Sequence, residues 1–209
     1  TISNVTSKGI LSAIGTSVAG IAGNAEGCSI TDCVNEAKIT GKQYIGGIVG
    51  SFLLGDITGC TNSGDITGGA AVGGIIGSSE ADAVIADCVN SGDIQATNSG
   101  PYIAGAGGIV GMLTTTSSQS SKDVIVINTI NKGQVSVPNG LCAGGIVGIA
   151  GSSSSDKKDI SFVSCGNYEK VSGSNYVSGI GTIQMTTGKS MSVENCFNIG
   201  EVTASNTVK

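Results

Sequence analysis

The residues most able to do chemistry in this chain are its seven cysteines, because five of them share one repeat position. These five are Cys33, Cys60, Cys88, Cys165 and Cys196. The chain has no C-x-x-C spacing and no His, so a zinc site is not indicated. Thr129 takes the same position in another repeat, which a disulfide or a metal site would not permit. We therefore expect reduced, buried thiols, although cysteine-rich extracellular chains ordinarily form disulfides.

An asparagine follows two residues after each of these cysteines, and after Thr129 as well. The six amides are Asn35, Asn62, Asn90, Asn131, Asn167 and Asn198. A carboxamide both donates and accepts hydrogen bonds, so asparagines at one repeat position can form a ladder along a stack. The alternative is a row of amides that binds a ligand, and the expected inward direction of the side chains argues against it.

The acidic and aromatic residues give a weaker signal of function. Asp65 and Asp93 share a repeat position with Lys38 and Lys170, which is typical of a solvated face, with calcium binding as the alternative. Tyrosines precede three of the repeats, at Tyr44, Tyr102 and Tyr176. They could form an exposed strip that stacks on sugars, or they could be half-buried at a corner. We predict no catalytic, cofactor-binding or metal-binding residue.

The composition excludes two classes of protein. The 10 basic residues are all Lys and are outnumbered by 15 acidic ones, giving a net charge of −5. A nucleic-acid-binding protein needs clustered positive charge, so we expect no nucleic-acid partner. No apolar run approaches the ~20 residues of a membrane-spanning helix, so we expect no transmembrane segment.

These side chains are positioned by a repeat built around the hexapeptide Ile45-Gly46-Gly47-Ile48-Val49-Gly50. Close copies begin at Val72, Ala106 and Ala143, and degenerate ones at Val18 and Val177. The fourth place is always isoleucine: Ile21, Ile48, Ile75, Ile109, Ile146 and Ile180. The copies are 27 to 37 residues apart, and the extra length falls at two fixed places only. Such insertions are tolerated at the corners of a stacked coil.

The second half of the repeat indicates strands, since Cys60, Asn62, Gly64 and Ile66 alternate with polar residues. We predict an all-β fold, a parallel β-solenoid (β-helix) that is right-handed, with about six coils and three short strands per coil. The strands should lie on the hexapeptide, before Ile57, and from Cys60 to Ile66, with a bend between Ile57 and Cys60. Leucine-rich repeats and propeller blades fit less well, because their signatures are absent.

We expect residues 1–209 to form a single solenoid domain, cut from a longer protein. The terminal coils should then be uncapped and open to end-to-end or edge contacts.

The hexapeptide and the element C-x-N-x-G-x-[IV] together resemble the GLUG-motif repeat family, over almost the whole chain. The resemblance implies a bacterial surface or secreted protein, such as an adhesin or the repeat region of an IgA-specific metallopeptidase. It brings no catalytic residues, and the zinc motif H-E-x-x-H of those peptidases is impossible without His. The copies at Val18 and Val177, and Glu169 at a glycine position, depart from the family pattern.

Three functions are compatible with these observations. The first is a non-catalytic adhesin module, extracellular or at the cell surface, that displays loops to a host or microbial protein or glycan. The second is a structural stalk that spaces another domain from the cell. The third and least favoured is an enzyme acting on polysaccharides, since parallel β-helices host such enzymes.

Overall fold

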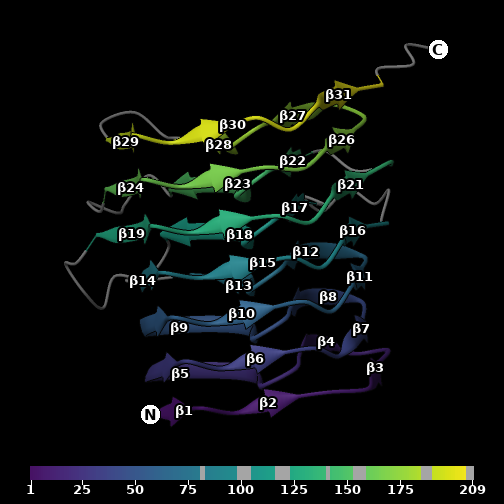
Figure 1. Cartoon of the computed structure of the whole chain (residues 1–209), viewed down its shortest axis with the longest axis vertical. Coiled ribbons are helices and arrows are strands. Elements are labelled where there is room, and N and C mark those ends of the chain that lie inside the picture. Colours follow the sequence, from purple (N-terminus) through teal and green to yellow (C-terminus); the bar gives the residue numbers. More distant parts are fainter. Residues whose placement is uncertain are drawn as a thin grey trace.

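The computed structural model describes residues 1–80, 83–97, 105–115, 123–139, 142–152, 159–184 and 190–205. All secondary structure in these segments is β, and every strand pairing is parallel. The chain winds through four sheets and stacks its coils one on the next along the long axis (Figure 1). The predicted fold class, a parallel β-solenoid of about six coils, is confirmed.

Sheet A is the largest, and each coil crosses it just after the hexapeptide corner. Its strands are β1 (Ile2–Ser3), β5 (Ala22–Thr31), β9 (Val49–Thr58), β13 (Ile76–Ser79), β14 (Ala83–Ala86), β18 (Val110–Thr115), β19 (Val124–Ile127), β23 (Val147–Ser152), β24 (Ile160–Val163), β28 (Gly181–Gln184) and β29 (Met191–Glu194). Within it, β13, β18, β23 and β28 stack on the first half of β9, and β14, β19, β24 and β29 stack on the second half.

Sheets B and C follow in each coil and consist of short strands. Sheet B contains β2 (Thr6–Ser7), β6 (Val34–Asn35), β10 (Thr61–Asn62), β15 (Val89–Asn90), β20 (Ile130–Asn131), β25 (Gly166–Asn167) and β30 (Phe197–Asn198). Sheet C contains β3 (Ile10–Ser12), β7 (Lys38–Thr40), β11 (Ile66–Gly68), β16 (Ile94–Ala96), β21 (Val135–Val137), β26 (Val171–Gly173) and β31 (Val202–Ala204).

Sheet D closes each coil and leads back into sheet A. Its strands are β4 (Thr16–Ala19), β8 (Gln43–Gly46), β12 (Ala70–Gly73), β17 (Gly105–Gly107), β22 (Cys142–Gly144) and β27 (Tyr176–Ser178).

Two of the strands predicted from the sequence are each interrupted by a corner of the coil. The hexapeptide is a corner and not a strand, because β8 ends at Gly46 and β9 begins at Val49. The stretch from Cys60 to Ile66 is also divided, into β10 and β11, because the chain turns a second corner after Asn62. Both breaks coincide with glycines that pack against a neighbouring coil, as described below.

The predicted bend before Cys60 is confirmed and has a clear backbone cause. The residue just before each cysteine position adopts a left-handed conformation, with φ of +53° to +66°. The seven residues at this place are Asn4, Asp32, Gly59, Asp87, Asn128, Ser164 and Asn195. Glycine, asparagine and aspartate are the residues that tolerate this conformation most readily. The recurrence of these residue types just before the cysteine is a sequence signal for the bend, which our prediction from the Ile57–Cys60 spacing did not use.

Coils of unequal length stay in register because the extra residues lie between strands, at one place in sheet A and in the connection from sheet C to sheet D between β16 and β17. In β9 the backbone bulges at Leu54 (φ +63°) and Gly55 (φ +131°). Ala83, the first residue of β14, pairs with Gly55, so the break between β13 and β14 lies at this bulge. The breaks between β18 and β19 and between β23 and β24 fall at the same level, since Thr115 pairs with Ser152 and Val124 with Ile160. This insertion point is therefore within a sheet, whereas the one between β16 and β17 is where the chain passes from sheet C to sheet D.

The interior of the coil is divided into two apolar clusters. The larger lies inside sheet A and contains Phe52, Ile57 and Phe162 together with the isoleucine and cysteine columns. The smaller lies between sheets C and D and contains Ile39, Ile45 and their equivalents in the other coils. The asparagine column runs between the two clusters.

An engineered insertion tests whether the bulge is a general insertion point. About eight Gly/Ser residues placed between Leu54 and Gly55 should lower the melting temperature by only a few degrees, since lengthening a flexible loop costs little entropy. The same insert between Thr61 and Asn62 should unfold the protein, because it displaces the asparagine from its column. Circular dichroism melts of both variants check this expectation. An equal loss of stability at the two sites would contradict it.

Candidate functional site

The six asparagines predicted to share a column form one continuous chain of hydrogen bonds. Each side-chain Nδ2 donates to the Oδ1 of the asparagine in the next coil, at 2.6 to 2.8 Å. The order is Asn35 to Asn62, Asn90, Asn131, Asn167 and Asn198. The first five of these side chains are essentially inaccessible to solvent, and Asn198 in the last coil is half-buried.

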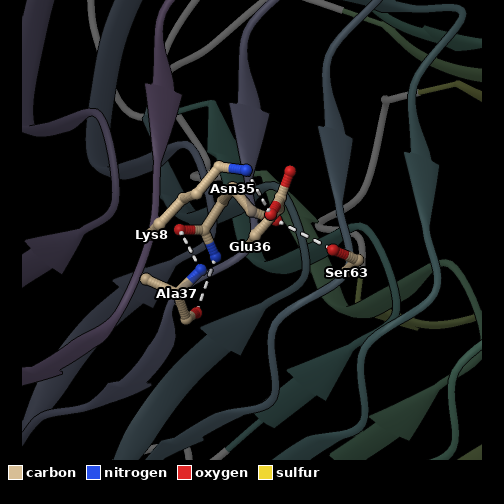
Figure 2. A network of polar contacts seen from close by, with 5 residues as sticks. All are labelled: Lys8, Asn35, Glu36, Ala37 and Ser63. Atoms are coloured by element: carbon tan, nitrogen blue, oxygen red, sulfur yellow. Dashed lines mark hydrogen bonds and ion pairs between the residues drawn. The ribbon is translucent and has the colours of Figure 1, made fainter.

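The second hydrogen of each carboxamide fixes the corner between sheets B and C. Each Nδ2 also donates to the backbone oxygen two residues later, at 2.7 to 2.9 Å. Figure 2 shows this pair at Asn35 and Ala37, where the Ala37 N–H also donates to Asn35 Oδ1 at 3.3 Å. A polar group buried without such partners would cost several kcal/mol. The ladder therefore satisfies the hydrogen-bonding groups of the buried amides and also stabilises the turn of the chain between sheets B and C.

A glycine of the hexapeptide faces each asparagine, which explains why the two elements recur together. A Cβ added to this glycine would lie only 2.2 to 2.7 Å from the asparagine side chain. The facing pairs are Gly20–Asn35, Gly47–Asn62, Gly74–Asn90, Gly108–Asn131, Gly145–Asn167 and Gly179–Asn198. The same Cβ would also meet the carbonyl of the next glycine along the column, at 2.3 Å for Gly47. Close approach of the two walls at this contact is what separates the two apolar clusters.

The isoleucine column lies beside this contact. Ile48, Ile75, Ile109 and Ile146 are fully buried, and each backbone N–H donates to the oxygen of the next isoleucine at 2.9 to 3.0 Å. Ile21 and Ile180, in the terminal coils, are only partly buried. Burying one such side chain contributes roughly 1.5–3 kcal/mol, so the column is a main source of stability.

The five cysteines of the repeat position point into the larger cluster. Cys33, Cys60, Cys88 and Cys165 are fully buried, whereas Cys196 is half-buried. All seven cysteines of the chain are free thiols. Each column thiol donates to the carbonyl two residues earlier, at 3.2 to 3.5 Å, which satisfies the backbone at the bend.

The environment raises the pKa of three of these thiols. Burial raises the pKa of Cys33 and Cys165 above the ordinary value of 9.0. The neighbouring Cys60 thiol and burial together raise the pKa of Cys88 well above that value. A hydrogen bond with the Cys88 thiol instead lowers the pKa of Cys60. Thiolate is the reactive form of cysteine, so the raised pKa of Cys33, Cys88 and Cys165 makes these three thiols less reactive at neutral pH. Thr129, at the gap in the column, donates its hydroxyl to Cys165 Sγ at 3.3 Å.

The outward acidic position is used for contacts between coils. Asp65 accepts the backbone N–H of Asp93 at 3.2 Å, and Asp93 accepts that of Gln134 at 2.9 Å. Lys38 lies 4.0 Å from Asp65, and Lys170 lies 3.0 Å from Glu201. Exposed ion pairs of this kind contribute at most about 1 kcal/mol each. Among the described residues, no group of three or more His, Cys, Asp or Glu side chains could hold a metal ion.

The two described tyrosines of the strip considered above differ in exposure. Tyr44 is half-buried, with a left-handed φ of +54°, whereas Tyr176 is 62% exposed. Tyr102 lies outside the described residues. A different pair, Tyr168 and Phe197, is brought together on the outer side of sheet B, with ring centroids 5.2 Å apart. Sequence reasoning missed this pair because the two residues occupy different places in their repeats.

The surface also has one solvent-open groove where the chain passes from sheet C to sheet D. It has a volume of about 510 Å³ and is lined by Ala13, Ile14, Gly41, Lys42, Gly69 and Thr97. Mostly small side chains, one isoleucine and a single charged residue give this groove little capacity for specific recognition.

The segments that match a known family each correspond to one coil. The GLUG motif matches residues 41–67 and 68–95, and each match runs from the start of a sheet D strand to the following sheet C strand. These two coils are similar to the GLUG repeat. The GLUG motif is a repeat found in surface-type proteins. No curated protein and no solved structure matches the chain.

The described residues include no helix that is long and apolar enough to cross a membrane.

The ladder can be tested with an isosteric change that adds a charge. Asn131 Nδ2 faces two acceptors, Gly133 O and Asn167 Oδ1. In Asn131→Asp an oxygen would replace this nitrogen, so burial and repulsion should raise the pKa of the new carboxyl above its unfolded value of ~3.9. The loss of stability should be smallest near pH 3 and grow as the pH rises above about 4, reaching roughly 3 kcal/mol or more at pH 7.

Urea unfolding of the variant and the native protein, measured at each pH, checks this result. Asn198→Asp is the matched control, because its side chain is half-buried and has no asparagine above it among the described residues. The control should lose much less stability. A pH-independent loss in Asn131→Asp would contradict the ladder geometry.

Proposed function

We propose that this chain is a non-catalytic repeat module of a bacterial adhesin, secreted or held at the cell surface, whose coils display variable segments to a ligand. The observation that carries the proposal is that, within each coil, the recurring residues stabilise the stack and the variable residues lie on the outside. The recurring residues point inward and are used in stacking, as the asparagine ladder and the isoleucine column show. Length and outward side chains differ from coil to coil.

The position of the variable segments supports display. The ends of β18 and β23 pair, and so do the starts of β19 and β24, so the segments between these strands leave adjacent coils side by side. Residues that emerge together from rigid strands are well placed to form one recognition surface. The two GLUG repeats are consistent with a surface location.

The second candidate is a stalk that only spaces another domain. It is favoured by the uninterrupted ladder from Asn35 to Asn198, which is typical of a stiff rod. Both candidates are non-catalytic, because the repeated polar groups are engaged in stacking contacts.

Binding to intact cells separates display from spacing. Fluorescently labelled protein should bind host or microbial cells saturably. A variant in which Gly-Ser replaces residues 116–122 and 153–158 should bind at least about tenfold more weakly, with an unchanged melting temperature. A variant with the same replacement at Gly69–Ala70, in a sheet D connection without extra length, is the control for handling and labelling. Absence of saturable binding by the native protein to any cell type would contradict display and favour the stalk.

A further inference from the structure

The only ring contact between described aromatic residues lies on the outer surface, where packing does not require it. Tyr168 and Phe197 meet edge to face, with an interplanar angle of 89°. They remain 41% and 40% exposed, respectively. The other two described phenylalanines, Phe52 and Phe162, are buried in the core. An exposed aromatic pair on a stacked sheet is therefore a departure from the rest of the molecule.

A local change in the repeat makes room for this pair. The outward position of sheet B is held by Val34, Thr61, Val89 and Ile130 in successive coils, and then by Gly166. Phe197 occupies the same position one coil later. Its ring leans back over Gly166, so that a Cβ there would lie 2.3 Å from the tip of the ring. Glycine at this one position holds the phenylalanine ring against Tyr168.

Edge-to-face geometry leaves one ring with neither face covered by its partner. In such a pair the ring whose edge is presented keeps both of its faces clear of its partner. The face of an aromatic ring carries partial negative charge and attracts the weakly positive C–H groups of a ligand. One side of a pyranose ring presents several such C–H groups. Ile199, which is 69% exposed, and Ile130 extend the apolar surface on either side.

Polar groups of both kinds flank the rings. Lys132 stands next to Tyr168 in the same column, one coil earlier, and Glu169 follows Tyr168 in the chain. Both side chains are exposed and form no ion pair with a described residue. An ammonium donates hydrogen bonds and a carboxylate accepts them, so together they complement hydroxyl groups, which do both. A purely apolar ligand could not form hydrogen bonds with Lys132 or Glu169, so a ligand with hydroxyl groups fits these two residues better.

We propose that Tyr168 and Phe197, with Lys132 and Glu169 at their rim, form a binding site for a hexopyranose unit of a glycan. The rings stack on the apolar side of the sugar, and the rim residues bond its hydroxyls. The site rests on the proposed display function, for which it supplies a ligand class. It lies on sheet B, whereas the variable segments interrupt sheet A.

Glycan-array binding followed by titration calorimetry tests the site. The native protein should bind at least one class of hexose-containing glycan. Phe197→Leu, which keeps an apolar side chain but removes the ring, should weaken binding roughly tenfold or more. Tyr168→Ala should do the same, whereas Tyr176→Ala, which removes an exposed tyrosine that has no ring partner among the described residues, should have no effect. Melting temperatures identify any variant that fails to fold.

The outcomes separate this site from the proposed function. Glycan binding that is equal in the native protein and in folded Phe197→Leu would overturn the site. Saturable cell binding without glycan binding would also overturn it while leaving display intact, and would indicate a protein ligand. No binding to glycans or cells would contradict both.

Discussion

The fold depends on the contact between an asparagine amide and the glycine that faces it. The amide must reach the next coil at 2.6 to 2.8 Å, and the glycine must have no side chain for the walls to close to this distance. Because the same pair recurs in six coils, each coil is held to one cross-section and one register. The isoleucine and cysteine columns can then fill one side of the contact, and the apolar residues of sheets C and D fill the other.

This constraint also explains which parts of the chain can vary. A residue added inside sheet B or at the hexapeptide corner would displace the amide or the glycine. A residue added at the sheet A bulge displaces neither, because Gly55 and Ala83 already pair across a break in regular geometry. Coils of 27 and 37 residues can therefore stack without loss of register. Variation in length is directed to this place and to the connection from sheet C to sheet D, and variation in sequence to the outward side chains, where recognition is proposed to occur.

Much of the architecture could be predicted from the sequence, because stacking imposes the same residue at the same place in every coil. The period, the parallel solenoid and the bend before Cys60 follow from Ile, Asn and Cys spacing alone. The corner at Gly47 could not be placed, because it depends on backbone contacts with other coils, such as that of Gly50 with Ser17 and Val18. The Tyr168–Phe197 pair could not be foreseen either, since it needs the missing side chain of Gly166 one coil away.

Hydrogen–deuterium exchange of the asparagine side-chain amides, followed by NMR, tests the ladder most directly. The amides of Asn62, Asn90, Asn131 and Asn167 should exchange slowly, because each is buried and bonded on both sides. The exposed amides of Asn4, Asn24 and Asn195 serve as references in the same spectrum and should exchange at once. Exchange of all the side-chain amides within the dead time, in a protein that is otherwise folded, would contradict the ladder and the account of the fold built on it.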